Sequence, residues 1–268
     1  NSIHELKNKY PDLDIGITGR PVLQNDEAMT TQSDSEYAGI ASFVLVALLF
    51  FIFFRTYRKS VLALVSLGFG IALTIGFISL TVGHINLLTM AFAIILIGLG
   101  IDYGIHFLMN YIQQEVKTPA ERSVATLKST GPAILIGAFT SALAFGTAVF
   151  TDFLGLQELG IIVGGGLIIC ALCFLLVYPA LLVLFDKEQK ISTPSFHWLY
   201  KTSKKPIYLI VIFVITLAFI PLSLKTKINH NLLDLQSPEL ESVRFEKILQ
   251  EGSKESTWFL AYQSKSLQ

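Results

Sequence analysis

The feature that most constrains the fold of this chain is a series of long segments with almost no charged residues. Each is near or above the roughly 20 residues that a helix needs to cross a bilayer. These segments lie at 37–54, 61–83, 85–112, 131–151, 159–185 and 206–224. Hydrophobic residues make up 52% of the chain and charged residues 15%, a composition too apolar for an ordinary soluble domain. The sequence therefore predicts an all-α polytopic membrane protein with a six-helix transmembrane bundle.

The basic residues of the loops indicate one orientation of that bundle. They all follow the first, third and fifth segments, as Arg55, Arg58, Lys59, Lys117, Arg122, Lys128, Lys187, Lys190, Lys201, Lys204 and Lys205. Because loops rich in Lys and Arg stay in the cytoplasm, we expect both chain ends to lie outside the cytoplasm. The 20 basic and 20 acidic residues cancel, so nothing indicates a nucleic acid as partner.

The polar segments 1–36 and 225–268 predict partial α/β structure outside the membrane. In the first, residues 14–21 alternate apolar and polar side chains as a strand does, and a polar helix should follow toward Tyr37. In the second, residues 237–251 predict a helix and 257–263 a strand. Their partner strands are expected elsewhere, so the chain is interpreted as a piece of a longer protein.

A helix start is predicted in the loop between the third and fourth segments. Thr118, Pro119 and Glu121 have the spacing of an N-cap, first-turn proline and capping-box glutamate. A short interfacial helix is expected to begin there and to end near Gly131 and Pro132.

The carboxylate Asp102 lies inside the third segment, in the stretch GLGIDYGIHF. An ionised Asp at mid-membrane costs about 2.5 to 3.5 kcal/mol on insertion scales, so it should face protein or a water-filled cavity. His106 lies one turn away on the same helix face, and Tyr103 adjoins the acid. The protonation of such a carboxyl depends on its neighbours and can be coupled to conformation. Asp102, Tyr103 and His106 are therefore candidates for a proton relay.

Glycines and hydroxyl residues suggest how the helix with Asp102 packs. Small residues let membrane helices approach closely, so Gly98, Gly100 and Gly104 are interpreted as helix-packing positions, with Gly98 on the Asp102 face. Thr140 and Ser141 in the fourth segment are candidates to line the same seam, although such hydroxyls often bond their own helix instead. The cysteines, Cys170 and Cys173, are too few for a tetrahedral thiolate site, and no metal site is predicted.

Two stretches resemble the resistance-nodulation-division superfamily, in particular its MmpL-like lipid exporters. GLGIDYGIHFLMNY is similar to their fourth transmembrane helix, and the stretch from TGPAILIGAF to YPALLVL resembles the following two helices. The resemblance extends over nearly the whole chain. INHNLLDLQSPELESV is further similar to the hopanoid transporter-like branch.

The resemblance implies that the chain covers helices two to seven of a twelve-helix transporter. Residues 1–36 would end a first periplasmic porter domain and 225–268 would begin a second. The family's Asp–Tyr proton relay carries over to Asp102 and Tyr103, with its partner groups in the missing half, helices 8–12. The implied activity is proton-driven export of hydrophobic or amphipathic lipids, with membrane lipids as substrate, protons as coupling ion and no cofactor. Assembly as a homo-oligomer is left open.

Other functions are also considered. A drug-efflux pump of the same superfamily and a sterol-sensing-like lipid-binding module that does not pump both fit the helical pattern. Intramembrane aspartyl proteolysis does not fit, because that chemistry needs a second carboxylate at the site and no other Asp or Glu lies within a predicted span. The preferred interpretation is a secondary active transporter and not an enzyme.

Overall fold

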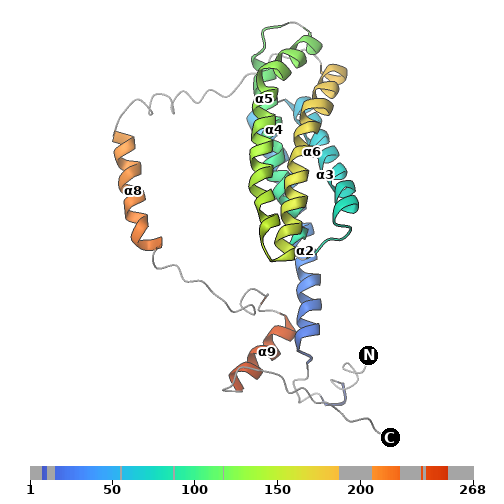
Figure 1. Cartoon of the computed structure of the whole chain (residues 1–268), viewed down its shortest axis with the longest axis vertical. Helices are drawn as coiled ribbons and strands as arrows, with labels where there is room; N and C mark the ends of the chain where they lie inside the picture. Colours follow the sequence, from blue (N-terminus) through green and yellow to red (C-terminus); the bar gives the residue numbers. More distant parts are fainter. Residues whose placement is uncertain are drawn as a thin grey trace. The chain divides into compact units, whose positions relative to one another are not determined.

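The computed structural model describes residues 8–10, 16–54, 56–86, 88–116, 118–186, 207–223, 237 and 240–252. These residues are mostly helical, and none of them forms a strand. The elements (Figure 1) are α2 (Arg20–Phe54), α3 (Tyr57–Thr81), η1 (Thr89–Ala91), α4 (Phe92–Gln113), α5 (Pro119–Gly146), η2 (Thr147–Phe150), α6 (Leu154–Phe185), α8 (Ile207–Ser223) and α9 (Glu241–Gly252). Two compact units are present, residues 31–197 and residues 1–30 with 198–268.

Within the described ranges, five helices are long and apolar enough to cross a membrane by length and composition. They are Arg20–Phe54, Tyr57–Thr81, Thr89–Gln113, Pro119–Phe150 and Leu154–Phe185, and they coincide with the first five predicted spans. The sixth predicted span corresponds to α8, whose 17 residues make it a shorter apolar helix. A six-helix membrane domain therefore remains a prediction.

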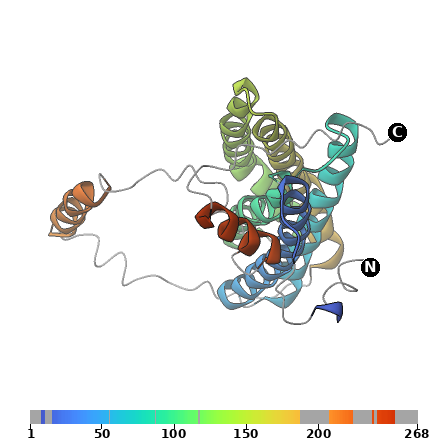
Figure 2. The same cartoon turned by 90° about the horizontal axis from the view of Figure 1, so that it is seen from below.

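In the unit 31–197, α6 lies against α3, α4 and α5 (Figure 2). A helix that is apolar all round belongs in the interior of a bundle, and the glycines of α6 allow close approach there. A Cβ at Gly160 would lie 2.5 Å from the Phe145 carbonyl oxygen, and one at Gly166 would lie 2.8 Å from Leu96 Cδ1. The glycines therefore set the close spacing of α6 against its neighbours.

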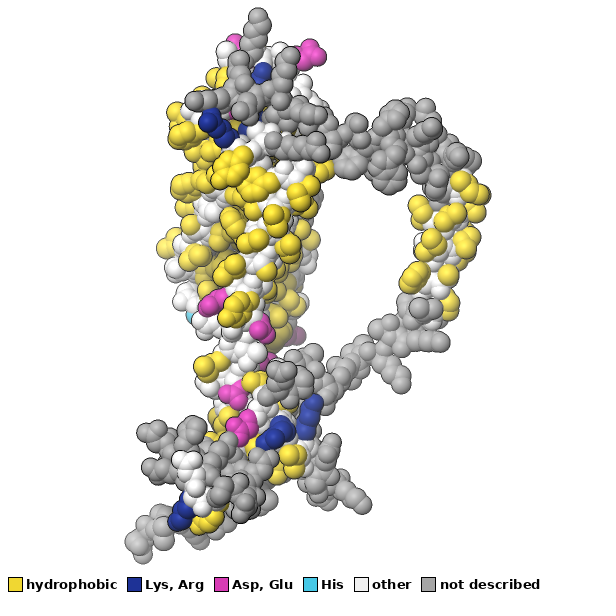
Figure 3. All heavy atoms as spheres, turned by 180° about the vertical axis from the view of Figure 1, so that it is seen from behind, with side chains coloured by type: hydrophobic (Ala, Val, Ile, Leu, Met, Phe, Trp, Pro, Cys, Tyr) yellow, Lys and Arg dark blue, Asp and Glu magenta, His cyan; other side chains and the backbone are white. Residues whose placement is uncertain are grey.

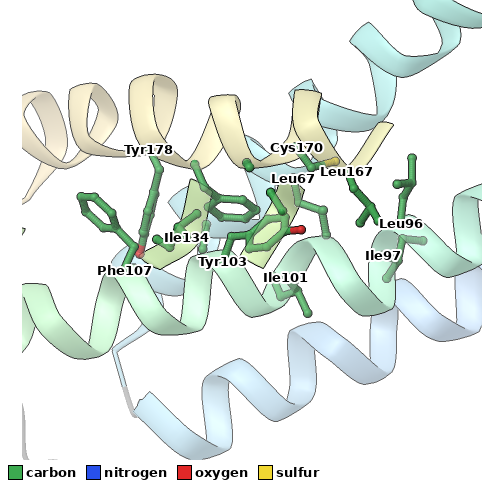
Figure 4. Packing of buried hydrophobic residues seen from close by; sticks show 14 of the residues in the cluster. Leu67, Leu96, Ile97, Ile101, Tyr103, Phe107, Ile134, Leu167, Cys170 and Tyr178 are labelled. Atoms are coloured by element: carbon green, nitrogen blue, oxygen red, sulfur yellow. The ribbon is translucent and has the colours of Figure 1, made fainter. Parts of the chain in front are cut away.

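An aromatic cluster joins α4 to α6 in the core of this unit. Phe107 and Tyr178 meet edge to face with ring centroids 5.5 Å apart, and Phe174 and Tyr178 do so at 5.8 Å. All three side chains are fully buried (Figure 4). Edge-to-face pairs add to the stability gained from burial alone, so α4 and α6 are firmly held together.

The face of the unit 31–197 seen in Figure 3 is mostly apolar between its two ends. Large hydrophobic side chains such as Leu80, Ile136 and Leu176 are exposed in this unit, which suits contact with hydrocarbon better than contact with water. The described Lys and Arg residues of this unit are Arg58, Lys59, Arg122 and Lys128. They lie in the first turns of α3 and the first third of α5, at one end of the bundle, hereafter the basic end.

The other unit contains the start of α2 and the helix α9. The Thr18 hydroxyl donates to the Ser242 carbonyl oxygen at 2.8 Å, and the Ser242 hydroxyl donates to Asp26 at 2.6 Å. The polar helix predicted before the first span is the beginning of α2, and the helix predicted at 237–251 is α9. The strand predicted at 257–263 lies outside the described residues.

The strand predicted at 14–21 is wrong over its described part. Residues 16–18 have no regular structure, and α2 already begins at Arg20. Gly19 has a φ of 111°, a conformation that glycine adopts readily, and Pro21 suits the first turn of a helix. These two residues end the irregular segment and start α2 earlier than the alternating pattern indicated.

The predicted start of α5 is confirmed, but its predicted end is wrong. The Thr118 hydroxyl accepts the backbone N–H of Glu121 at 3.3 Å, and Pro119 occupies the first turn. The helix then continues through Pro132 to Gly146 instead of ending near Gly131. An internal proline removes one backbone hydrogen bond, whereas ending the helix in an apolar surrounding would leave several groups unpaired.

Candidate functional site

A cleft of about 230 Å³ lies between α4 and α5. Its lining on α4 comes from residues at helical spacings of three and four, which share one face. These residues are Leu99, Asp102, Tyr103 and His106 from α4, and Thr130, Ala133, Ile134, Gly137 and Ser141 from α5. The cleft thus brings together Asp102, Tyr103, His106 and Ser141, four of the residues that the sequence selected.

The two ionisable side chains of this cleft face outward. Asp102 and His106 are both exposed in this chain, and the Asp102 carboxylate makes no hydrogen bond to any residue that the structure describes. His106 follows Asp102 by one helical turn toward the basic end. The face that carries them has room for water or for a further part of the protein.

Tyr103 takes a different position from Asp102. Only 7% of it is exposed, and Figure 4 shows it directed from α4 toward α6, near Leu67 and Cys170. Adjacent residues of a helix point about 100° apart, so the tyrosine forms the inner wall of the cleft while the aspartate stays open. Of the two residues predicted as a relay pair, Tyr103 therefore lies in the core and Asp102 lies open in the cleft.

Two of the three glycines have the close contacts expected of packing positions. A Cβ at Gly104 would meet the Phe174 ring at 2.5 Å, and one at Gly100 would meet Leu67 Cδ1 at 3.1 Å. A Cβ at Gly98 would meet no atom within 4 Å. Gly98 therefore packs against no helix that the structure describes, because it lies on the open face with Asp102.

The hydroxyl residues of α5 divide between two surfaces. Ser141 lines the cleft, whereas Thr140 donates to the Gly137 carbonyl oxygen at 3.0 Å and lines an apolar groove with residues of α5 and α6. Sequence reasoning missed Thr130, which lines the cleft about three turns before Ser141. That spacing is a signal only for a helix that continues through Pro132, which the sequence did not predict.

A buried ion pair at the basic end was also missed. Lys59 at the start of α3 pairs with Asp186 at the end of α6, and each side chain is 1% exposed. The Tyr111 hydroxyl donates to Asp186 Oδ2 at 2.8 Å, and the Tyr178 hydroxyl donates to the Lys59 carbonyl oxygen at 3.2 Å. The sequence placed Lys59 among the loop cations. The available signal was a lysine just before one apolar span and an aspartate just after another, at the same end of the bundle.

The cysteines Cys170 and Cys173 are free and buried. Among the described residues, no three His, Cys, Asp or Glu side chains come close enough together to hold a metal ion.

A bundle of helices that are long and apolar enough to cross a membrane defines the class as a multi-pass membrane protein. Residues 2–206 match the MMPL family, and the chain belongs to that family. The resemblance of the Asp102 helix to MmpL-like proteins is thereby confirmed.

Curated relatives carry transporter names. The chain is 26% identical over 247 residues to the hopanoid transporter HpnN of Burkholderia multivorans, an alignment covering 89% of the chain and 28% of the relative. It is 28% identical to the protein of that name from Rhodopseudomonas palustris, covering 85% of the chain and 27% of the relative. The apo-petrobactin exporter of Bacillus anthracis is 26% identical over 68% of the chain and 26% of its own length. The chain thus spans about 28% of the first of these relatives.

Proposed function

We propose that this chain is part of a secondary active transporter that exports hydrophobic or amphipathic lipids, and that proton movement through Asp102 drives the export. The observation that carries the proposal is the cleft, in which a carboxylate stands open on a membrane helix beside a histidine. Protein interiors in membranes rarely hold such a group without a functional reason. The family match supports transport as the activity.

The lipid substrate is proposed from the relatives. Two of them are named hopanoid transporters and align with 89% and 85% of this chain. Hopanoid-like lipids are therefore the proposed substrate class, and the direction proposed is from the inner membrane toward the periplasm or the outer membrane.

The arrangement proposed for the whole protein keeps both ends of this chain on the periplasmic side. Residues 37–224 form six spans with α8 as the last, and the flanks 1–36 and 225–268 belong to two periplasmic porter domains. The open face of α4 is then covered by the second half of the transporter. The basic end, with Arg58, Arg122 and Lys128, is cytoplasmic on this proposal, since basic loops resist translocation.

The proposal is tested by Asp102→Asn in the whole protein, reconstituted in lipid vesicles with an imposed proton gradient. Asparagine keeps the size of the side chain but cannot release a proton. We expect gradient-driven lipid export and coupled proton flux to fall to the level of empty vesicles, with normal insertion. Asp152→Asn is the matched control, because Asp152 is exposed between η2 and α6 and does not line the cleft. Full transport by Asp102→Asn would overturn the proton-coupled mechanism.

The same experiment separates the other functions. A lipid-binding module would bind hopanoid-like lipid in the vesicles but would move none of it, with or without a gradient. Export of a polar small molecule is the second candidate, favoured by the apo-petrobactin exporter among the relatives. It would appear as gradient-driven transport that added lipid does not compete with.

A further inference from the structure

A row of polar residues runs along α4 from the cleft to the basic end. Asp102, His106, Asn110 and Gln114 follow one another at intervals of four residues, which places them on one i, i+4 ridge of the helix. Asn110 and Gln114 are partly exposed, and the Gln114 side chain donates to Asn110 Oδ1 at 2.7 Å. The row therefore leads from the carboxylate to the link between α4 and α5.

The facing side of α5 continues this row with hydroxyl groups. Thr130 lines the cleft together with His106, and its hydroxyl lies 3.5 Å from that of Ser129. The Ser129 hydroxyl donates to Asn110 Oδ1 at 2.7 Å. One turn further, the Thr126 hydroxyl is buried and has no partner among the described residues, a situation that ordered water usually resolves.

On α4 itself, polar side chains extend from Asp102 in one direction only. Toward the opposite end of α4, the nearest residues of the same face are Gly98, Leu99 and Ile95. None of them offers a side-chain hydrogen-bonding group. Away from the basic end, the described lining of the cleft adds the hydroxyl of Ser141 on α5, whereas toward the basic end the polar side chains form a continuous row.

We propose that Asn110, Ser129 and Thr130 form a hydrated track through which the proton bound at Asp102 passes to the cytoplasmic side. This inference rests on the proposed function and names residues that its mechanism does not otherwise require. Each hydroxyl or water on the track accepts a proton on its oxygen and releases its own to the next group. The amides of Asn110 and Gln114 do not carry the proton. They order the water, since Asn110 Oδ1 accepts from both Ser129 and Gln114 and its amide group remains free to donate.

Charged side chains lie at the far end of the track, as expected if the track opens to water there. Glu115 follows directly after Gln114, and Arg122 donates from Nε to the Val116 carbonyl oxygen at 2.6 Å. Lys128 adjoins Ser129 on α5. Among the described residues of α4, α5 and their link, the charged groups along the track are thus Asp102 and His106 at its start and these three at its exit, and the hydroxyls between them are neutral.

The first test measures water access and does not depend on transport. Single cysteines are introduced as Asn110→Cys or Ser129→Cys into the whole protein, with other accessible cysteines replaced, and a charged, membrane-impermeant thiol reagent is added to one side. We expect both to be labelled from the cytoplasmic side. Thr140→Cys is the control, since Thr140 lines an apolar groove that a charged reagent does not enter. Labelling of none of the track positions would overturn the proposal.

The second test measures proton flux with a matched set of variants of α5. Thr130→Val removes the hydroxyl at constant shape, and we expect it to slow coupled proton flux about tenfold, the order of magnitude by which losing one hydrogen-bonding partner shifts an equilibrium. Thr130→Ser should restore the flux, and Thr140→Val should leave it unchanged. If the role of Thr130 is purely structural, restoring the hydroxyl with Thr130→Ser should not restore the proton flux.

The outcomes separate this inference from the proposed function. If Asp102→Asn abolishes export while Thr130→Val and Asn110→Leu leave proton flux unchanged, the proton takes another route and the proposed function stands. If Asp102→Asn transports fully, the proton-coupled function itself is wrong. In that case, labelling of the track positions would show a water-filled seam that does not carry the transported proton.

Discussion

The buried pair of Lys59 and Asp186 gives the sharpest prediction about stability. Each side chain is 1% exposed, and the pair joins the start of α3 to the end of α6. Lys59→Met removes one charge and leaves the other buried with the Tyr111 hydroxyl as its remaining described partner. Removing one member of a buried ion pair costs about 3 to 5 kcal/mol, because the other charge stays out of water without compensation.

A double variant distinguishes the cost of an unpaired charge from the loss of a favourable contact. Lys59→Met with Asp186→Leu removes both charges and replaces them with apolar side chains. Buried ion pairs replaced in this way are often neutral or more stable by about 1 to 4 kcal/mol, so the double variant should recover most of the loss. The free energy of unfolding is measured by titrating the detergent-solubilised whole protein with a denaturing detergent, followed by circular dichroism.

The pair of His84 and Glu158 at the opposite end supplies the control. Its nitrogen and oxygen lie 3.3 Å apart, but the His84 side chain is 62% exposed. Exposed ion pairs contribute about 0 to 1 kcal/mol, so His84→Gln, which leaves the hydrogen bond from Asn86 to Glu158 in place, should change stability little. If Lys59→Met costs no more than His84→Gln, or if the double variant is as unstable as the single one, the reasoning from burial is refuted.

Two further pairs of substitutions test how α4 and α5 are built. Gly104→Leu forces a side chain into the Phe174 ring and should cost about 1 to 3 kcal/mol through overpacking, whereas Gly98→Ala meets open space and should be neutral or stabilising by up to about 1 kcal/mol. Equal losses of unfolding free energy in the two would contradict the two-faced packing of α4. Thr118→Ala removes the N-cap of α5 and should cost about 1 kcal/mol, with Thr118→Ser retaining the stability. An unchanged unfolding curve for Thr118→Ala would show that the cap is dispensable.

The sequence predicted those features that depend on one helix at a time. Span positions followed from charge-free runs, and the contacts of Gly100 and Gly104 followed from the spacing of small residues on one helix. Asp102 and Ser141 were both placed at the seam where the cleft lies. In each case helical periodicity alone decides which way a residue points.

The sequence did not predict features that depend on contact between two distant segments. It also failed where two local rules conflict. Lys59 and Asp186 are far apart along the chain, and no period within either helix indicates that they meet. Pro132 was expected to end a helix, but the need to keep backbone groups paired in an apolar surrounding outweighed the bond that proline removes. The same continuity of α5 is what puts Thr130 on one face with Ser141.

The two sides of α4 place a limit on how protonation of Asp102 can be transmitted. On one side, Gly100 and Gly104 bring α4 into close contact with its neighbours. About one turn nearer the basic end, Phe107 packs against an aromatic ring of α6. Close-packed interiors resist small displacements, and the Tyr111 hydrogen bond to Asp186 ties the same helix at the basic end. Asp102, in contrast, faces the open side, where no described residue bonds it. A change in its charge therefore acts first on whatever covers that face. In the two-half arrangement proposed above, we expect motion between the halves before any rearrangement within this one.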